Sequence, residues 1–398
     1  MVAITTLLII LIAIGASFFA AWTIGAGSSG STPFAPAVGA GAITTLRAAF
    51  IVGLLGLIGA VLQGAAVTET VGAGLIAGET LTPLASAIAL TIAAVYIAAG
   101  VFAGYPIATA FAITGSVVGV GLALGGDPAW GAYQTIGLYW LLTPVFVAPP
   151  AYVVTKLLRG DRVSNTLVMP SLSASVGAVV ANMEFLVLGP PGEQGSLATT
   201  VADGLPGSDI VPIALTTVAV AGVFAWVTLR SVRTDAVRTQ RLFLIGLGAL
   251  VAFTAGAGKV GLAVGPLLPL AEGQLPIAAI WPVLVFGGIG ILLGSWMAAP
   301  RMIKALSQDY SSLGPRRATA VLVPSFVIAQ AGIFLGVPMA FNQIFIAAMA
   351  GVGYAVSADT VSERKLLITS IAWIGSLIFG LLIGYAVYYG VTTVTGVA

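Results

Sequence analysis

Long apolar segments dominate this chain and limit it to one class of fold. A helix that crosses a bilayer needs about 20 apolar residues. The chain is 59% hydrophobic and 7% charged, whereas a soluble protein carries about 25% charged residues. We therefore expect an all-α polytopic protein of the cell membrane. About twelve membrane segments follow from this length criterion, at 3–45, 47–66, 82–103, 105–126, 131–156, 166–189, 211–229, 242–272, 277–297, 319–336, 338–356 and 366–391.

Two glycine-rich runs interrupt the apolar segments, at 25–33 and at 256–261. Glycine weakens a helix and Pro33 removes a backbone donor, so we expect a broken helix at both places. Unwound backbone at membrane depth occurs only where it lines a cavity or is buried in protein. Paired interruptions of this kind are typical of a transporter's binding site. The segments at 105–126 and 338–356 are further candidates for re-entrant helices.

Basic residues cluster in three connections between apolar segments, whereas the connection at 190–210 carries acidic residues without Lys or Arg. The positive-inside rule places the basic connections in the cytoplasm. With one crossing per segment, both termini are then extracytoplasmic. The clustered residues are Lys156, Arg159, Arg162, Arg230, Arg233, Arg238, Arg241, Arg301, Lys304, Arg316 and Arg317.

The two halves of the chain repeat one pattern. A Gly-Tyr-Pro motif at 104–106 and a Gly-Val-Pro motif at 336–338 are each followed, at the same distance, by Gly-Val-Gly. Corresponding segments run in opposite directions in the topology above. We therefore expect two inverted repeats of five segments each, with broken or re-entrant helices and a site at their interface near the midplane. The domains would be a first repeat at 1–160, a two-helix insert with a cytoplasmic loop at 161–240, and a second repeat at 241–398.

The absence of cysteine and histidine excludes several kinds of site. With Cys 0 and His 0, the chain can form no disulfide, no thiolate or imidazole metal site and no His-dependent catalytic triad. Its net charge of +2 does not indicate a nucleic-acid partner. We expect no metal site, no cofactor and no enzymatic activity.

Several segments resemble the inorganic phosphate transporter (Pit-type) family. They read Val-Gly-Ala-Gly-Ala-Ile-Thr-Thr-Leu-Arg at 38–47, Leu-Gln-Gly-Ala-Ala-Val-Thr-Glu-Thr at 62–70, Gly-Leu-Ala-Val-Gly-Pro-Leu at 261–267 and Gly-Gly-Ile-Gly-Ile-Leu-Leu-Gly at 287–294. The resemblance covers nearly all of the chain outside 166–230. It implies inverted repeats, a homodimer, and a secondary transporter that moves phosphate, or sulfate in a related branch, with sodium or protons.

The chain departs from the family at the signature itself. The family signature reads Gly-Ala-Asn-Asp-Val-Ala-Asn in both halves, and its Asn and Asp hold cations and phosphate. Here Ser28 and Ser29 align with the first Asn-Asp pair, and Gly258 and Lys259 align with the second. The missing aspartates leave the coupling ion open between Na⁺ and H⁺. The serine-rich first signature is more similar to the sulfate-permease branch.

The candidate site has the groups that a tetrahedral oxyanion needs. These are N–H groups at helix N-termini, hydroxyl donors and a cation. Lys259 is the only Lys or Arg deep within an apolar segment, and we expect its ammonium to supply the charge that sodium supplies elsewhere in the family. The expected substrate-binding residues are Ser28, Ser29, Gly30, Ser31, Thr32, Thr109, Gly258, Lys259, Val260, Asn342 and Gln343.

Structural roles are the alternative for each of these side chains. Serine and threonine in spanning helices commonly donate to a carbonyl one turn back. Lys259 would reach an interface if its segment were shallow, and Asn342 and Gln343 would join helices. Glu184 is either a proton carrier or an interfacial residue, and we favour the second role.

Phosphate and sulfate rank nearly level as substrates. A site with donors and no carboxylate suits sulfate, because phosphate near neutral pH keeps a proton that rewards an acceptor, whereas the family favours phosphate. Two other interpretations are a membrane bundle without transport activity and an intramembrane hydrolase with a Ser29–Lys259 dyad.

Overall fold

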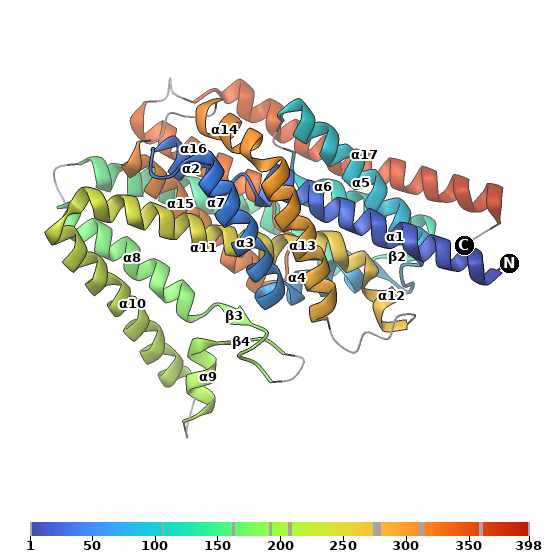
Figure 1. The fold of residues 1–398 in the computed structure, drawn as a ribbon, viewed down its shortest axis with the longest axis horizontal. Coiled ribbons are helices and arrows are strands. Elements are labelled where there is room, and N and C mark those ends of the chain that lie inside the picture. The colour runs from blue at the N-terminus through green and yellow to red at the C-terminus, as the bar shows by residue number, and fades with distance from the viewer. Residues whose placement is uncertain are drawn as a thin grey trace.

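Helices make up nearly all of the regular structure (Figure 1). The computed structural model describes residues 2–105, 107–160, 164–190, 193–205, 209–273, 280–309, 314–357 and 361–396. The β-structure within these ranges is two antiparallel ribbons, β1 (Ile76–Ala77) with β2 (Asp127–Pro128) and β3 (Glu184–Phe185) with β4 (Gly195–Ser196). The expected all-α class is confirmed.

The helices form two series of similar order, with three helices between them. The first series is α1 (Val2–Ile24), the π-helical turn η1 (Gly25–Ser29), α2 (Ala35–Gly39), α3 (Thr45–Gln63), α4 (Ala65–Ala73), α5 (Pro83–Ala103), α6 (Thr109–Ala123) and α7 (Trp130–Arg159). The second series is α11 (Ala236–Val264), the 3-10 turn η2 (Gly265–Leu267), α12 (Leu268–Gly273), α13 (Trp281–Met297), α14 (Ala299–Asp309), α15 (Pro315–Phe334), α16 (Phe341–Val356) and α17 (Glu363–Thr395). Between the series lie α8 (Asn165–Ala181), α9 (Leu197–Asp203) and α10 (Ile210–Thr234).

Eight helices in the described ranges are long and apolar enough to cross a membrane: α1 with η1, α3, α5, α7, α10, α11, α15 and α17. Four shorter apolar helices, α6, α8, α13 and α16, are also present. Each expected segment coincides with one helix of these two groups, so a multi-pass membrane protein is confirmed. The apolar pattern missed the short helices α4, α9 and α14, because they are too short to leave a membrane-length signal.

The second glycine-rich run does not break its helix. The helix α11 continues through 256–261 and ends only at Val264, so the expected interruption there was wrong. The run serves close packing instead, because a Cβ on Gly256 would lie 1.9 Å from the carbonyl oxygen of Gly56 in α3. A continuous helix satisfies its own backbone groups, which lipid cannot do.

The first glycine-rich run does interrupt its helix. At Gly25 the α-helical hydrogen bonding of α1 changes to the π-helical turn η1, and a non-helical turn then leads to α2. This turn also packs closely, since a Cβ on Gly25 would lie 2.2 Å from the carbonyl oxygen of Ile291 in α13. In each series, therefore, a glycine at the same place brings the first helix against the other series.

The two series interlock through corresponding pairs of helices. The helix α6 packs against α17 and α16 against α7, while α1 packs against α13 and α11 against α3. A Cβ on Gly115 of α6 would lie 2.2 Å from the carbonyl oxygen of Leu377, and one on Gly351 of α16 would lie 2.1 Å from that of Ala148. Glycine at such crossings lets membrane helices approach closely. In Figure 1, α1 and α11 run in opposite directions.

The helices α8 and α10 lie side by side along one flank of the bundle (Figure 1). The expected segment at 166–189 is shorter than predicted, because α8 ends at Ala181 and the chain enters the β3–β4 ribbon. The backbone N–H of Leu186 donates to the carbonyl oxygen of Leu62 at 2.8 Å, which ties this connection to the end of α3. The apolar stretch of α10 is left unburied.

Substitution of Gly256 tests the role of close packing. We expect Gly256→Ala to destabilise the protein by about 1–3 kcal/mol, because the added methyl group overpacks the contact with α3. Gly246→Ala is the matched control, since Gly246 lies in the same helix with nothing within 4 Å of its Cβ position. Thermal unfolding in detergent measures both variants. Equal unfolding temperatures would contradict the packing role.

Candidate functional site

Two connections that lead into helix N-termini meet inside the bundle. The Asn342 side chain, in the first turn of α16, donates to the carbonyl oxygen of Ile107 before α6 at 2.7 Å. The Trp140 indole N–H in α7 donates to the carbonyl oxygen of Pro338 before α16 at 2.9 Å. Pro106 of the first Gly-Tyr-Pro motif lies outside the described residues. A helix N-terminus presents free N–H groups and about half a positive charge, so this junction favours an anion.

Lys259 reaches this junction from the continuous helix α11. Its side chain is 0% exposed, and its ammonium donates to the Thr109 hydroxyl in the first turn of α6. Nζ also lies 5.7 Å from the ring centroid of Phe341 at the start of α16. Both of these partners are neutral, although a buried charge normally needs an opposite charge. The ammonium therefore stands where an anion would be stabilised.

The first glycine-rich run brings hydroxyl groups to the same region. The Thr32 hydroxyl donates to the Ser28 carbonyl oxygen and lies 3.4 Å from Asn342 Oδ1. Ser31 donates to the carbonyl oxygen of Gly27 at 2.9 Å, as a structural serine does. Ser28 is buried, and its hydroxyl has no hydrogen-bond partner within the described ranges. An unpaired buried hydroxyl is costly, so Ser28 is the side chain of this run that is available to a ligand.

Three of the expected site residues face other parts of the protein. The Ser29 hydroxyl points back to the carbonyl oxygen of Ile24 at the end of α1, at 3.5 Å. Gly30 lies against α13 and α14, where a Cβ would meet side chains of both helices. Val260 packs towards Gly64 and Gly287.

Gly258 and Gln343 flank the junction. A Cβ on Gly258 would lie 3.2 Å from Met339 and 3.4 Å from Phe341, so this glycine lets the connection before α16 approach α11. The Gln343 amide donates to the carbonyl oxygen of Trp140 at 2.8 Å. Its Oε1 is buried without a hydrogen-bond partner among the described residues, which leaves one acceptor beside the donors.

Three aromatic residues at the junction were missed by the sequence analysis. Phe111 stacks on Trp140 with ring centroids 3.9 Å apart, and Phe341 lies beside the ammonium of Lys259. Phe111 and Phe341 each follow a Gly-x-Pro motif within five residues, which was the available signal. Nothing in the sequence marked Trp140, because its partners are distant along the chain.

A second buried polar cluster joins α3, α11 and α15. Gln63 and Gln330 exchange amide hydrogen bonds at 3.1 and 3.2 Å, and Gln330 also donates to the Thr254 hydroxyl at 2.7 Å. All three side chains are buried. Buried polar groups need such partners. Sequence reasoning missed this cluster, since a single glutamine in an apolar segment does not identify its partner.

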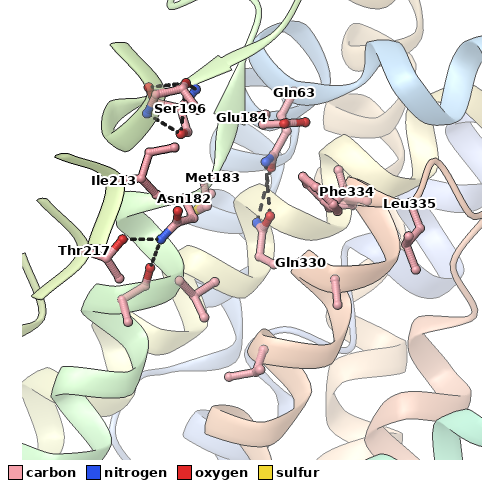
Figure 2. Close-up of a pocket in the computed structure, with 16 residues that line it drawn as sticks. Gln63, Asn182, Met183, Glu184, Ser196, Ile213, Thr217, Gln330, Phe334 and Leu335 are labelled. Carbon is pink, nitrogen blue, oxygen red and sulfur yellow. Dashed lines mark hydrogen bonds between the residues drawn. The ribbon is translucent and has the colours of Figure 1, made fainter. Parts of the chain in front are cut away.

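A cavity of about 620 Å³ lies between this cluster and the α8–α10 flank. Figure 2 shows the Gln63–Gln330 pair on one side of it. On the other side, the Asn182 amide donates to the Thr217 hydroxyl at 2.9 Å. Among the described residues that line the cavity, Glu184 is the only charged one. A lone carboxylate repels an anion, so the cavity is a poorer candidate for oxyanion binding than the junction around Lys259.

Comparison with known sequences gives one family. A model of the phosphate transporter family matches residues 24–384. A protein named as a predicted phosphate permease in Thermococcus kodakarensis is 26% identical over 390 residues, which cover 92% of this chain and 93% of that protein. The chloroplastic inorganic phosphate transporter 2-1 of Arabidopsis thaliana is 26% identical over 408 residues, which cover 87% of this chain and 67% of that protein.

Comparison with solved structures agrees with the sequence comparison. The chain is similar to a structure described as the sodium-dependent phosphate transporter, with a TM-score of 0.81 and 25% sequence identity. The match covers 97% of this chain and 99% of the other. The similarity therefore extends over both helical series.

The glutamine pair allows a double-mutant test. We expect Gln330→Leu to cost about 1–3 kcal/mol of stability, because it leaves the Gln63 amide buried without its partner. The double variant Gln63→Leu/Gln330→Leu should cost less than the sum of the single variants. Gln240→Leu, near the start of α11, is the control. Chemical unfolding in detergent measures all four, and additive costs would contradict the coupling.

Proposed function

The chain belongs to the phosphate transporter family, and we propose that it moves inorganic phosphate through the junction of α6, α11 and α16. It is a transporter and not an enzyme. One observation carries the location of the site: Lys259 is fully buried with neutral partners, beside two helix N-termini. The ammonium and the two helix N-termini are all positive, and a tetrahedral oxyanion would balance their charge.

The side chains at this junction would each have a different role in binding the anion. Lys259 supplies the formal charge. The Thr109 hydroxyl accepts from Lys259, so its own hydrogen can point to an anion. The unpaired Ser28 hydroxyl adds a donor, and Asn342 holds the connection before α6 in place. The acceptor Oε1 of Gln343 would suit the proton that phosphate retains near neutral pH, which supports phosphate over sulfate.

Inverted repeats would allow this single site to open to either side in turn. The interlocked pairs α6–α17 and α16–α7, and the opposite directions of α1 and α11 (Figure 1), support this proposal. Residues 1–160 and 241–398 would form the repeats and 161–240 the insert. The basic connections would face the cytoplasm and both termini the other side. These orientations and a homodimer stay predictions, which accessibility labelling and crosslinking would test.

The residues at the signature positions do not fit a sodium ion. The similar solved structure is described as sodium-dependent, and the family signature implies aspartates that hold cations. In this chain Ser28 and Ser29 replace the first Asn-Asp pair of the signature, and Gly258 and Lys259 replace the second. Lys259 places a fixed ammonium in the site. A second cation there would be repelled. We therefore propose that phosphate binding in this chain does not need sodium.

Removal of the buried ammonium tests the site. We expect Lys259→Ala to abolish uptake of radiolabelled phosphate into proteoliposomes, because it removes the charge that an anion in a low-dielectric site requires. Lys304→Ala is the matched control, since Lys304 is exposed on α14; it should change uptake by less than about twofold. Unchanged uptake in Lys259→Ala would overturn the assignment. Sulfate uptake in preference to phosphate would overturn the proposed substrate.

Replacement of sodium tests the fixed-cation role separately. We expect the affinity of purified protein for phosphate to change by less than about twofold when sodium is exchanged for N-methylglucamine at constant pH and ionic strength, which is under about 0.4 kcal/mol. Isothermal titration measures the affinity directly. A loss of tenfold or more without sodium would contradict the role of Lys259 as a substitute cation, while leaving phosphate as the substrate.

A further inference from the structure

The cavity on the α8–α10 flank has mostly apolar walls. Its volume of about 620 Å³ is within the usual range for a small-molecule site, about 300–1,000 Å³. An apolar enclosure of this kind disfavours a hydrated inorganic ion and suits an apolar chain. The apolar lining includes Val179, Met183, Ile213, Val327, Phe334 and Leu335.

A carboxylate without a counter-charge lines the same cavity. Glu184 follows the end of α8, and its backbone pairs with that of Ser196 in the β3–β4 ribbon. Its side chain is half-buried, and the carboxylate has no hydrogen bond or ion pair among the described residues. Burial raises the pKa of the Glu184 carboxyl. The residues lining the cavity carry no positive charge. A cation brought by a ligand would offset the cost of partly desolvating this carboxylate.

The rim of the cavity is apolar, and its outer wall belongs to a helix with an apolar stretch. Phe334 is 66% exposed and Leu335 is 55% exposed, although both line the cavity. The outer wall includes Ile213 and Thr217 of α10, a helix whose apolar stretch is unburied. Exposed apolar surface of this kind on a membrane protein meets lipid. The rim therefore favours a ligand that arrives from the bilayer.

The inner end of the cavity is separated from the phosphate site by a thin layer. Ile333 lines the cavity and lies 3.3 Å from the Cβ position of Gly258, the neighbour of Lys259. The Gln63–Gln330 pair lies in the same wall, with its amides bonded to each other (Figure 2). The cavity and the phosphate site are thus neighbours with opposite chemistry, one anionic and one cationic.

We propose that this cavity binds an aminophospholipid, with the lipid's ammonium group on Glu184 and an acyl chain along the apolar wall. A primary ammonium offers three donors to a carboxylate. Phe334 and Leu335 at the rim contact the chain where it leaves for the bilayer. Asn182 and Ser196 are further polar residues in the lining. Phosphatidylethanolamine has this chemistry.

A lipid in this place would couple the α8–α10 flank to the transport bundle. It would contact the last turn of α15, from which the chain passes directly into the connection before α16. That connection contains Pro338 and Met339, which pack at the phosphate site. The inference goes beyond the proposed function, since it holds for whichever anion the protein carries.

Head-group preference tests the proposal. Delipidated full-length protein in detergent is titrated with short-chain phosphatidylethanolamine or with phosphatidylglycerol of the same chain length, and thermal stabilisation is followed by tryptophan fluorescence. We expect phosphatidylethanolamine to bind the native protein about tenfold more tightly, as one charge-assisted contact allows. Glu184→Gln should remove this preference. Glu193→Gln is the matched control, an exposed carboxylate in the same connection, and should keep it.

A cavity-filling variant tests the location independently. Ala178 lines the cavity and is half-buried, so Ala178→Phe should reduce stabilisation by both lipids. Equal binding of the two lipids to the native protein would overturn the proposal, as would a preference that survives Glu184→Gln. Unchanged stabilisation of Ala178→Phe would also overturn it. Phosphate uptake is measured separately, so failure here leaves the transport assignment standing.

Discussion

An uncompensated positive charge at membrane depth is the constraint on which this structure depends. The ammonium of Lys259 is fully buried and donates to the neutral hydroxyl of Thr109. The N-termini of α6 and α16 add positive potential at the same place. A buried ion normally has an opposite charge beside it, and here a mobile anion would fill that role. The same bound anion would then be the substrate and would stabilise the buried charge in the core.

Close packing of backbones delivers Lys259 to that place. The helix α11 approaches α3 through Gly256 and Gly56 until the backbones nearly touch, and η1 approaches α13 through Gly25 in the same way. Side chains at these crossings would move the helices apart and shift Lys259 relative to Thr109. The glycines therefore act by keeping the helix backbones close together, because membrane helices associate by contact between small residues rather than by hydrophobic burial.

The sequence predicted the positions of the membrane segments well, because a bilayer imposes a fixed apolar length on each of them. It also identified Lys259, whose charge is conspicuous in an apolar segment. It failed at 256–261, where glycine has two possible uses, unwinding a helix or letting another helix approach. It failed also at Gln63 and Gln330, since a polar residue in an apolar segment does not reveal its partner.

The sequence by itself determined that this is a multi-pass helical membrane protein of the phosphate transporter family with one lysine at membrane depth. The membrane class and the position of the lysine depend on composition and on the spacing of apolar segments, whereas the family follows from the similarity of the sequence to its members. Only the tertiary structure decided which helix is broken, that α1 is interrupted at Gly25 while α11 continues to Val264. Only it placed Thr109, Asn342 and Lys259 together and left the carboxylate of Glu184 without a partner among the described residues. Such contacts join residues far apart in sequence, and the helix crossings that create them are set by packing across the whole bundle.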